Sequence, residues 1–214
     1  KLNIEKYFNK NSKKITESKI CILASVVPKF NLFIKKIILK KNYKFFNLDA
    51  SNIPFKIKIK YDLDKIGADR IANTIAAINN KYKNCIIVDF GTATTFDVIK
   101  NNCYEGGIIF PGIKISLDSL VKNAALLKNT KIFKIKTIVS NSTIESIQSG
   151  FYWGYISLIN GIIKKIIKEK KFKPRIILTG GFSKIFKDQV ILNPIINENL
   201  TLEGLAIIGK KINE

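Results

Sequence analysis

Histidine and methionine are both absent from this sequence of 214 residues, and only three residues are cysteine. The lack of histidine excludes Ser-His-Asp and Cys-His catalysis by this chain, and it excludes metal sites that depend on imidazole. Cys21, Cys85 and Cys103 are odd in number and contain no Cys-x-x-Cys pair, so neither a disulfide framework nor a zinc knuckle is indicated. We therefore expect a reducing, cytoplasmic location.

Long hydrophobic runs are also missing. The longest uncharged apolar stretch covers residues 150–163 and is shorter than the roughly 18 to 20 residues that cross a bilayer as a helix. No membrane span is predicted. Because residue 1 is Lys rather than Met, we also expect the protein to continue on the N-terminal side of Lys1.

Negative charge is scarce, since 37 Lys and Arg stand against 16 Asp and Glu and give a formal net charge of +21. Such an excess is typical of surfaces that bind nucleic acid. The lysines, however, occur in ones and twos along the whole chain between Ile and Asn residues, and all three residue types have AT-only codons. We therefore favour a composition bias of the genome over a dedicated nucleic-acid surface, which stays the alternative.

Apolar residues alternate between strand-like runs and helical spacing, which predicts an α/β fold. The predicted strands cover residues 20–27, 85–90, 94–99, 104–110 and 175–178, and the predicted helices cover 30–40, 64–82, 116–127, 143–168, 182–187 and 202–212. The three central strands are joined by links too short for a crossover helix, so they should form an antiparallel meander. Residues 52–61 are expected to be an extended connection. Gly150 and Gly161 are candidate breaks in the helix of 143–168.

The helix predicted for residues 30–40 has lysines on one face and apolar residues on the other. A strand signal directly precedes it, so a helix packed on a sheet is favoured over one lying on a membrane surface. The residues expected to point inward are Phe30, Phe33, Ile34, Ile37 and Ile38.

The sharpest chemical pattern is the segment from Val88 to Asp97, in which a buried strand runs into a Gly-Thr turn. Gly91 lets the backbone pass close to a ligand, Thr92 brings a hydroxyl and an N–H donor, and Asp89 is available for a cation. This pattern predicts a phosphate cradle, and a plain hairpin with turn-capping threonines is the alternative.

Two further segments carry candidate chemistry. Gly67-Ala68-Asp69-Arg70 opens a predicted helix with a carboxylate that could accept a proton and a guanidinium that could hold an anion, although an Asp in a first turn often only compensates the helix dipole. Thr179-Gly180-Gly181 follows a predicted strand, and paired glycines let a flat nucleotide lie against backbone. A tight strand-to-helix turn is the alternative there.

Taken together, these segments resemble, in order along the chain, those of the type III pantothenate kinases of the acetate and sugar kinase, actin-like superfamily. The matching segments are Ala24 to Pro28, Tyr61-Asp62 leading to Gly67 to Arg70, Val88 to Asp97, Gly106-Gly107 to Ile113, Ser142-Thr143 to Gly150, Thr179 to Gly181, and Leu200 to Leu205. They extend over nearly the whole chain, which makes the ordered set specific although each segment is short.

The resemblance implies a mixed-sheet α/β fold of the actin-like (ribonuclease H-like) ATPase type, with helices flanking the sheets and a first lobe that is incomplete at its N-terminus. The expected domains are residues 1–82 and 83–214. The implied activity is ATP-dependent phosphorylation of pantothenate to 4′-phosphopantothenate, on the way to coenzyme A. A cytoplasmic homodimer with its substrate site near the subunit boundary is also implied, and neither membrane nor nucleic-acid binding is expected.

The resemblance also assigns roles to residues. Asp69 would be the catalytic base, and Tyr61, Gly67, Ala68, Arg70 and Thr143 would surround pantothenate. Gly91, Thr92, Gly180 and Gly181 would bind ATP, which brings Mg²⁺ with it. Asp89 would hold a monovalent cation, K⁺ or NH₄⁺.

The sequence departs from the family in one respect, because the first phosphate loop, Asp-x-Gly-Asn-Thr, does not occur in it. We expect either that the sequence is a fragment of a complete enzyme or that the gene is shortened. In the second case a non-catalytic relative of the same fold, regulatory or associated with nucleic acid, is the alternative function.

Overall fold

The computed structural model describes residue 6 and residues 20–62, 65–122 and 130–214. The chain folds into two compact units: the first holds residues up to 57, 61–80 and 200–214, and the second holds 58–60 and 81–199. Neither unit is one continuous segment of the chain, because residues 58–60 belong to the second unit and the C-terminal helix belongs to the first.

The second unit is built on a sheet of six strands, which lie in the order β3-β6-β5-β4-β7-β8. The strands are β3 (Lys58–Ile59), β4 (Cys85–Phe90), β5 (Ala93–Lys100), β6 (Cys103–Pro111), β7 (Arg175–Gly180) and β8 (Ile195–Ile196). Strand β5 is antiparallel to β4 and β6, which confirms the predicted meander, whereas β7 and β8 extend the sheet in parallel on the other side of β4. A meander followed by two parallel strands beyond its first strand is the strand order of the ribonuclease H-like fold, so the expected fold class is confirmed.

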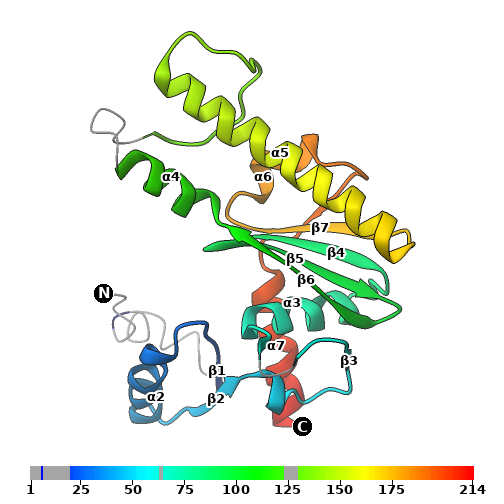
Figure 1. Ribbon diagram of the computed structural model, residues 1–214. Coiled ribbons are helices and arrows are strands. Elements are labelled where there is room, and N and C mark those ends of the chain that lie inside the picture. Colours follow the sequence, from blue (N-terminus) through cyan, green and yellow to red (C-terminus); the bar gives the residue numbers. More distant parts are fainter. Residues whose placement is uncertain (1–5, 7–19, 63–64, 123–129) are drawn as a thin grey trace. The chain divides into compact units, whose positions relative to one another are not determined.

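One long helix, α5 (Thr143–Lys170), covers a face of this sheet (Figure 1). Its buried aromatic and aliphatic side chains, among them Tyr152 and Ile159, pack against strand residues such as Val88 and Phe96. The helix starts where the Ser142 hydroxyl accepts a hydrogen bond from the Glu145 N–H, and it runs without a break. The candidate breaks at glycines 150 and 161 are therefore wrong, because helical backbone tolerates an isolated glycine at a cost of about 1 kcal/mol.

Each of the shorter helices of the second unit comes directly after a strand of the sheet. Helix α4 (Ile113–Lys122) follows β6, and α6 (Ser183–Phe186) with the 3₁₀ turn Lys187–Gln189 follows β7. The helix predicted for 116–127 thus begins three residues earlier, and the part of that prediction beyond Lys122 lies outside the described residues.

The first unit contains two parallel strands, β1 (Ile20–Ala24) and β2 (Lys44–Leu48), connected through the 3₁₀ turn Pro28–Phe30 and α2 (Asn31–Lys40). A second 3₁₀ turn, Ala50–Asn52, follows β2 and is capped by the Asp49 carboxylate. Helices α3 (Ala68–Asn79) and α7 (Leu200–Asn213) pack side by side in the same unit (Figure 1).

Two expectations about the first unit are wrong. Only Ile37 and Ile38 of α2 are buried, whereas Phe30 and Phe33 are more than half exposed, so the apolar face of this helix is narrower than its spacing predicted. Strand β1 was expected to be buried and to reach Val27, but it is half-buried along its whole length and ends at Ala24. Among the described residues it pairs with β2 alone.

Candidate active site

Several predicted site residues of the second unit converge on one edge of its sheet. Strands β4 and β7 are parallel and in register there, with Asp89 beside Thr179 and Phe90 beside Gly180. The start of β5 reaches the same edge, where Ala93 pairs with Pro111 at the end of β6. Open α/β sheets bind ligands at the carboxyl ends of their strands.

Gly180 lies at the closest approach between β7 and β4. Its φ is +82°, a conformation that favours glycine, and a Cβ built on it would lie 2.6 Å from the Phe90 carbonyl oxygen and 2.7 Å from Asp89 Oδ1. A side chain at this position would therefore fill the space beside the Asp89 carboxylate. Around Gly181, by contrast, no atom lies within 4 Å of the corresponding position, which leaves room against the backbone.

The turn between β4 and β5 is tight and exposed. The Gly91 N–H donates to the Ala93 carbonyl oxygen at 3.0 Å, and both Gly91 and Thr92 face solvent. Behind the turn lies Gly112, where a Cβ would overlap the Thr92 carbonyl oxygen and come within 2.7 Å of that of Gly91. Gly112 thus supports the cradle. It is not among the predicted site residues, and a Pro-Gly pair between a strand and a helix is the sequence signal that could have indicated its role.

The ligands available at this edge are oxygen atoms, which suits a hard cation. Asp89 supplies a half-buried carboxylate, and the neighbouring turns supply backbone carbonyl groups. Nowhere in the described part of the chain do three His, Cys, Asp or Glu side chains gather as they would in a transition-metal site. The residues present therefore fit a single-carboxylate cation site better than a multi-carboxylate one.

The first unit carries the second group of predicted residues, around the start of α3. Gly67 is the N-cap and Asp69 lies in the first turn, where its Oδ1 accepts a hydrogen bond from the Arg70 N–H at 2.9 Å. The same oxygen lies 2.6 Å from where a Cβ on Gly67 would be, so the half-buried carboxylate folds back over the helix end. Its position also compensates the helix dipole, as the simpler interpretation predicted.

Arg70 and Tyr61 form a contact of their own. The guanidinium carbon lies 5.7 Å from the centre of the Tyr61 ring, within the range of a cation–π interaction. Arg70 is only 4% exposed, so most of its side chain is enclosed by protein, and Ala68 is buried as well. The structure therefore brings Tyr61 and the Gly67–Arg70 segment together within the first unit.

Thr143 is placed differently from the other predicted residues of the second unit. It is the first residue of α5, and the whole first turn of that helix is exposed to solvent. The first turns of α5 extend past the sheet in Figure 1. The structure therefore does not bring Thr143 to the edge that holds Asp89 and Gly180.

Comparison with known proteins decides the family. Residues 1–165 match the family model of the type III pantothenate kinases. The chain belongs to this family. It is 45% identical over 188 residues to the type III pantothenate kinase of Pelagibacter ubique, which covers 86% of this chain and 75% of that protein. It is 40% identical over 210 residues to that of Persephonella marina, with 95% and 81% covered.

Type III pantothenate kinases are ATP-dependent enzymes of coenzyme A biosynthesis, so the kinase predicted from the sequence is confirmed and the relatives give no support to the non-catalytic alternative. Among solved structures, a conserved Campylobacter jejuni protein assigned to the Baf family of transcriptional activators superposes with a TM-score of 0.62 at 23% identity, covering 99% of this chain and 89% of that one. A likeness at this identity concerns the fold alone.

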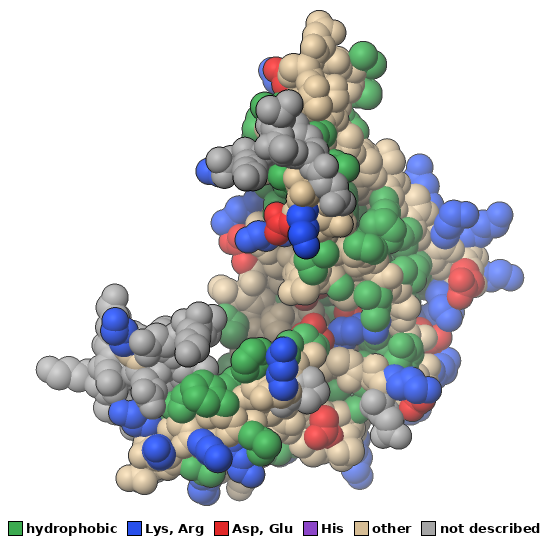
Figure 2. Space-filling model, turned by 60° about the vertical axis from the view of Figure 1, so that its left-hand side comes forward, with side chains coloured by type: hydrophobic (Ala, Val, Ile, Leu, Met, Phe, Trp, Pro, Cys, Tyr) green, Lys and Arg blue, Asp and Glu red, His purple; other side chains and the backbone are tan. Residues whose placement is uncertain are grey.

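Two further expectations concern the surface and the helices of this type III pantothenate kinase, namely that it binds neither nucleic acid nor membranes. On the face shown in Figure 2, Lys and Arg side chains are scattered among apolar and acidic ones instead of forming one basic patch. Of the helices that the structure describes, none has the length and hydropathy needed to cross a bilayer.

Proposed function

We propose that this pantothenate kinase uses Asp69 as the base that accepts the proton of the pantothenate hydroxyl, and that ATP binds at the sheet edge formed by Asp89, Gly91, Thr92 and Gly180. The observation that carries the second part is the register of β4 and β7, which pairs Gly180 with Phe90 and so brings its Cβ position within 2.7 Å of Asp89 Oδ1, although the two segments are far apart in the sequence.

In the proposed reaction, the hydroxyl oxygen of pantothenate forms a bond to the γ-phosphorus of ATP while the bond from that phosphorus to the β,γ-bridging oxygen breaks. The hydroxyl proton goes to the Asp69 carboxylate, and the electron pair of the broken bond leaves with ADP. Mg²⁺ bound to ATP would supply positive charge that offsets the charge of the phosphates. A positioned general base contributes about 10²- to 10⁴-fold to the rate of such a transfer.

The residues around Asp69 support its role as the base because they determine where its carboxylate lies. Gly67 leaves space for the carboxylate, and the Arg70 N–H holds one of its oxygens. We propose that Tyr61, Gly67, Ala68 and Arg70 surround pantothenate. Because Arg70 is enclosed and lies over the Tyr61 ring, it also orients that ring.

Asp89 is proposed to hold a monovalent cation, K⁺ or NH₄⁺. A half-buried carboxylate beside the phosphates of a nucleotide is unfavourable unless a positive charge lies between them. The carboxylate and the nearby carbonyl oxygen of Phe90 provide oxygen donors for such an ion. Activity should then depend on K⁺ or NH₄⁺ at constant ionic strength, and equal turnover in Na⁺ would contradict the assignment.

A cytoplasmic homodimer is proposed for the full-length protein. Apolar side chains lie exposed just before α5 and on its first turn, including Ile138, Val139 and Ile144, and exposed apolar clusters often mark contacts between chains. A second copy bound there would enclose Thr143, which gives that residue a way to take part in a site near the subunit boundary. The three cysteines are free, in keeping with a reducing compartment. Sedimentation equilibrium tests the dimer, and a monomer at micromolar concentration would contradict it.

The experiment that tests Asp69 separates binding from turnover. In the full-length protein, Asp69→Asn should lower kcat by about 10²- to 10⁴-fold, while pantothenate binding measured by calorimetry changes little. The exposed Asp118 on α4 provides a charge-matched control, and Asp118→Asn should leave both quantities unchanged. An unchanged kcat in Asp69→Asn would remove this residue from the mechanism.

A further inference from the structure

Residues 58–60, called the strap below, belong to the second unit although the residues on either side of them belong to the first. The chain leaves the first unit after Ile57, contributes Lys58–Ile59 to the sheet of the second unit as strand β3, and returns to the first unit at Tyr61. The residue that follows the strap is thus one of the residues proposed to contact pantothenate.

The backbone of the strap is held by few interactions. Strand β3 pairs with β6 through only two residue pairs, Lys58 with Cys103 and Ile59 with Tyr104. One further hydrogen bond runs from the Lys60 N–H to the Tyr104 carbonyl oxygen at 2.8 Å. So short an edge strand is marginal without additional contacts.

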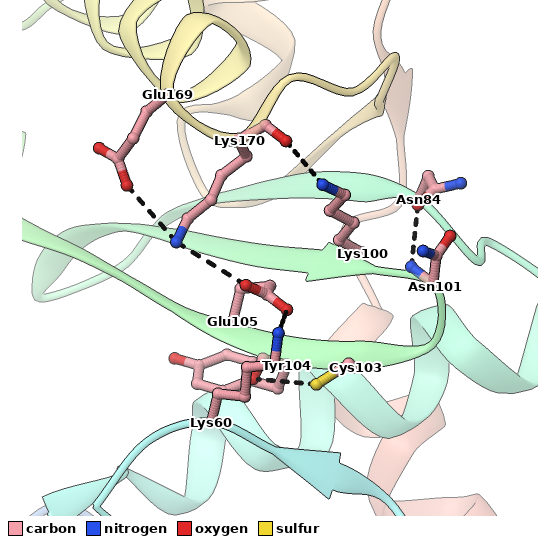
Figure 3. A network of polar contacts seen from close by, with 9 residues as sticks. All are labelled: Lys60, Asn84, Lys100, Asn101, Cys103, Tyr104, Glu105, Glu169 and Lys170. Carbon is pink, nitrogen blue, oxygen red and sulfur yellow. Dashed lines mark hydrogen bonds and ion pairs between the residues drawn. The ribbon is translucent and has the colours of Figure 1, made fainter.

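The additional contact is an ion pair between Lys60 and Glu105, shown in Figure 3. The Lys60 Nζ lies 2.7 Å from Glu105 Oε1, and the Glu105 side chain is only 10% exposed whereas that of Lys60 is 68% exposed. The hydrogen bond and charge of Lys60 hold the pKa of Glu105 below its usual range against the opposing effect of burial, and Lys170 and Lys100 lower it further. Glu105 is therefore ionised at neutral pH.

Glu105 is itself fixed from the opposite side by the end of α5. Lys170 Nζ lies 3.7 Å from Glu105 Oε2, and Lys100 Nζ donates to the Lys170 carbonyl oxygen at 2.7 Å (Figure 3). Within the second unit, the Glu105 carboxylate thus lies between lysines of α5 and of the strap, and of its ion pair with Lys60 the lysine is the exposed partner. A long exposed lysine loses side-chain entropy when it is held, so the pair restrains the strap and contributes little to overall stability.

We propose that Lys60 and Glu105 are positioning residues for pantothenate binding: the ion pair fixes the end of the strap, and thereby the backbone at Tyr61, whose ring contacts the Arg70 guanidinium. This inference rests on the proposed contact between Tyr61 and pantothenate. Without the ion pair, Lys60 separates more readily from β6, and the backbone at Tyr61 becomes less ordered. Part of the free energy of pantothenate binding is then needed to order Tyr61, so the affinity for pantothenate falls.

The test uses the full-length enzyme with Glu105→Gln and Lys60→Met, which remove one charge each and keep the size of the side chain. Both should raise the KM for pantothenate by roughly 3- to 10-fold, a loss between that of a fully exposed ion pair and that of a buried charge-assisted hydrogen bond. The KM for ATP should stay within a factor of about two, and the double variant should be no worse than either single variant. Lys60→Arg, which keeps the charge, should restore the normal KM.

Two controls separate this role from general stability. Lys134 and Asp188 form another exposed ion pair of 2.7 Å in the second unit, away from the strap, and Asp188→Asn should leave both KM values unchanged. Hydrogen exchange at the Lys60 amide, which donates to β6, should accelerate in Glu105→Gln and not in Asp188→Asn.

The outcomes distinguish this inference from the proposed function. If Tyr61→Leu raises the KM for pantothenate but Glu105→Gln and Lys60→Met do not, the positioning role is wrong and the substrate contact stands. An unchanged KM in Tyr61→Leu overturns both. Equal increases in the KM for pantothenate and for ATP would show that the ion pair supports the fold in general, which also overturns the inference.

Discussion

Gly180 offers the sharpest structural prediction, because it lies where β7 approaches the Asp89 carboxylate. In Gly180→Ala the new methyl group would be 2.6 Å from the Phe90 carbonyl oxygen, which is backbone and cannot rotate away. To reach 3.0 Å, the lower limit of real Cβ contacts, the two strand ends must separate by about 0.4 Å. The Asp89 carboxylate, at 2.7 Å from the same methyl position, has to move as well.

The cost has two parts. A non-glycine residue at φ +82° is strained by roughly 1–2 kcal/mol, and inserting a methyl group into a packed site costs typically about 1–3 kcal/mol. We therefore expect Gly180→Ala to lower the free energy of unfolding by about 2–5 kcal/mol, a large fraction of the roughly 5–15 kcal/mol that holds a protein folded. Because Asp89 is displaced, the KM for ATP should rise too.

Urea denaturation of the full-length protein measures the first effect, and Gly181→Ala is the matched control. Gly181 has open space where its methyl group would go, so its substitution should change stability by less than about 0.5 kcal/mol. If nucleotide lies against this backbone, Gly181→Ala raises the KM for ATP without loss of stability. Equal stability of the two variants would refute the reasoning.

Three other predictions follow from single residues. Gly204→Ala on α7 should destabilise the protein by about 1–3 kcal/mol, since a Cβ there would overlap the Ala72 carbonyl oxygen of α3; Gly209→Ala, where the nearest atom is the flexible end of Ile22 at 3.1 Å, should cost less than about 1 kcal/mol in the same denaturation assay. Burial, with a smaller contribution from the charge of Asp97, raises the pKa of the Cys85 thiol to about 12. The unfolded thiol ionises near pH 9 while the folded one stays protonated, so stability should be lost as pH rises above 9, by about 1.4 kcal/mol between pH 7 and pH 10; a comparison of urea curves at these two pH values should show a smaller loss in Cys85→Ala, and an equal loss would contradict it. Asp89→Asn should weaken ATP binding more than pantothenate binding in calorimetry, and the opposite order would show that Asp89 has another role.

The central meander could be predicted to within one residue at each end because β-branched runs joined by links as short as two residues leave little choice. Strand β3 was predicted only as part of an extended connection, although residues 55–61 alternate strictly between apolar side chains and lysines. That Lys58 and Ile59 pair with β6 depends on a tertiary contact. The burial of α2 was also overestimated. Helical spacing showed which face of α2 is apolar, but the exposure of Phe33 depends on the tertiary packing around the helix, which spacing does not determine.

The sequence allowed the residues of the candidate site to be predicted as two sets, but it did not allow the geometry of either set to be predicted. Sequence order placed Asp69 in the first turn of a helix, where it is found, and Gly180 in the turn after a strand, whereas the structure makes Gly180 the last residue of that strand. The support that Gly112 gives to the Gly91–Thr92 turn, and the anchoring of Lys60 by Glu105, depend on tertiary contacts between distant segments, which no local pattern predicts.

The most direct test of the proposed mechanism is a single-turnover measurement with full-length enzyme in excess over pantothenate. MgATP is added in the presence of K⁺, the reaction is quenched at set times, and 4′-phosphopantothenate is quantified by mass spectrometry. The mechanism predicts rapid formation of this product by the natural protein and a rate about 10²- to 10⁴-fold lower in Asp69→Asn, with pantothenate still bound. Equal single-turnover rates in the two proteins would contradict the assignment of Asp69 as the base.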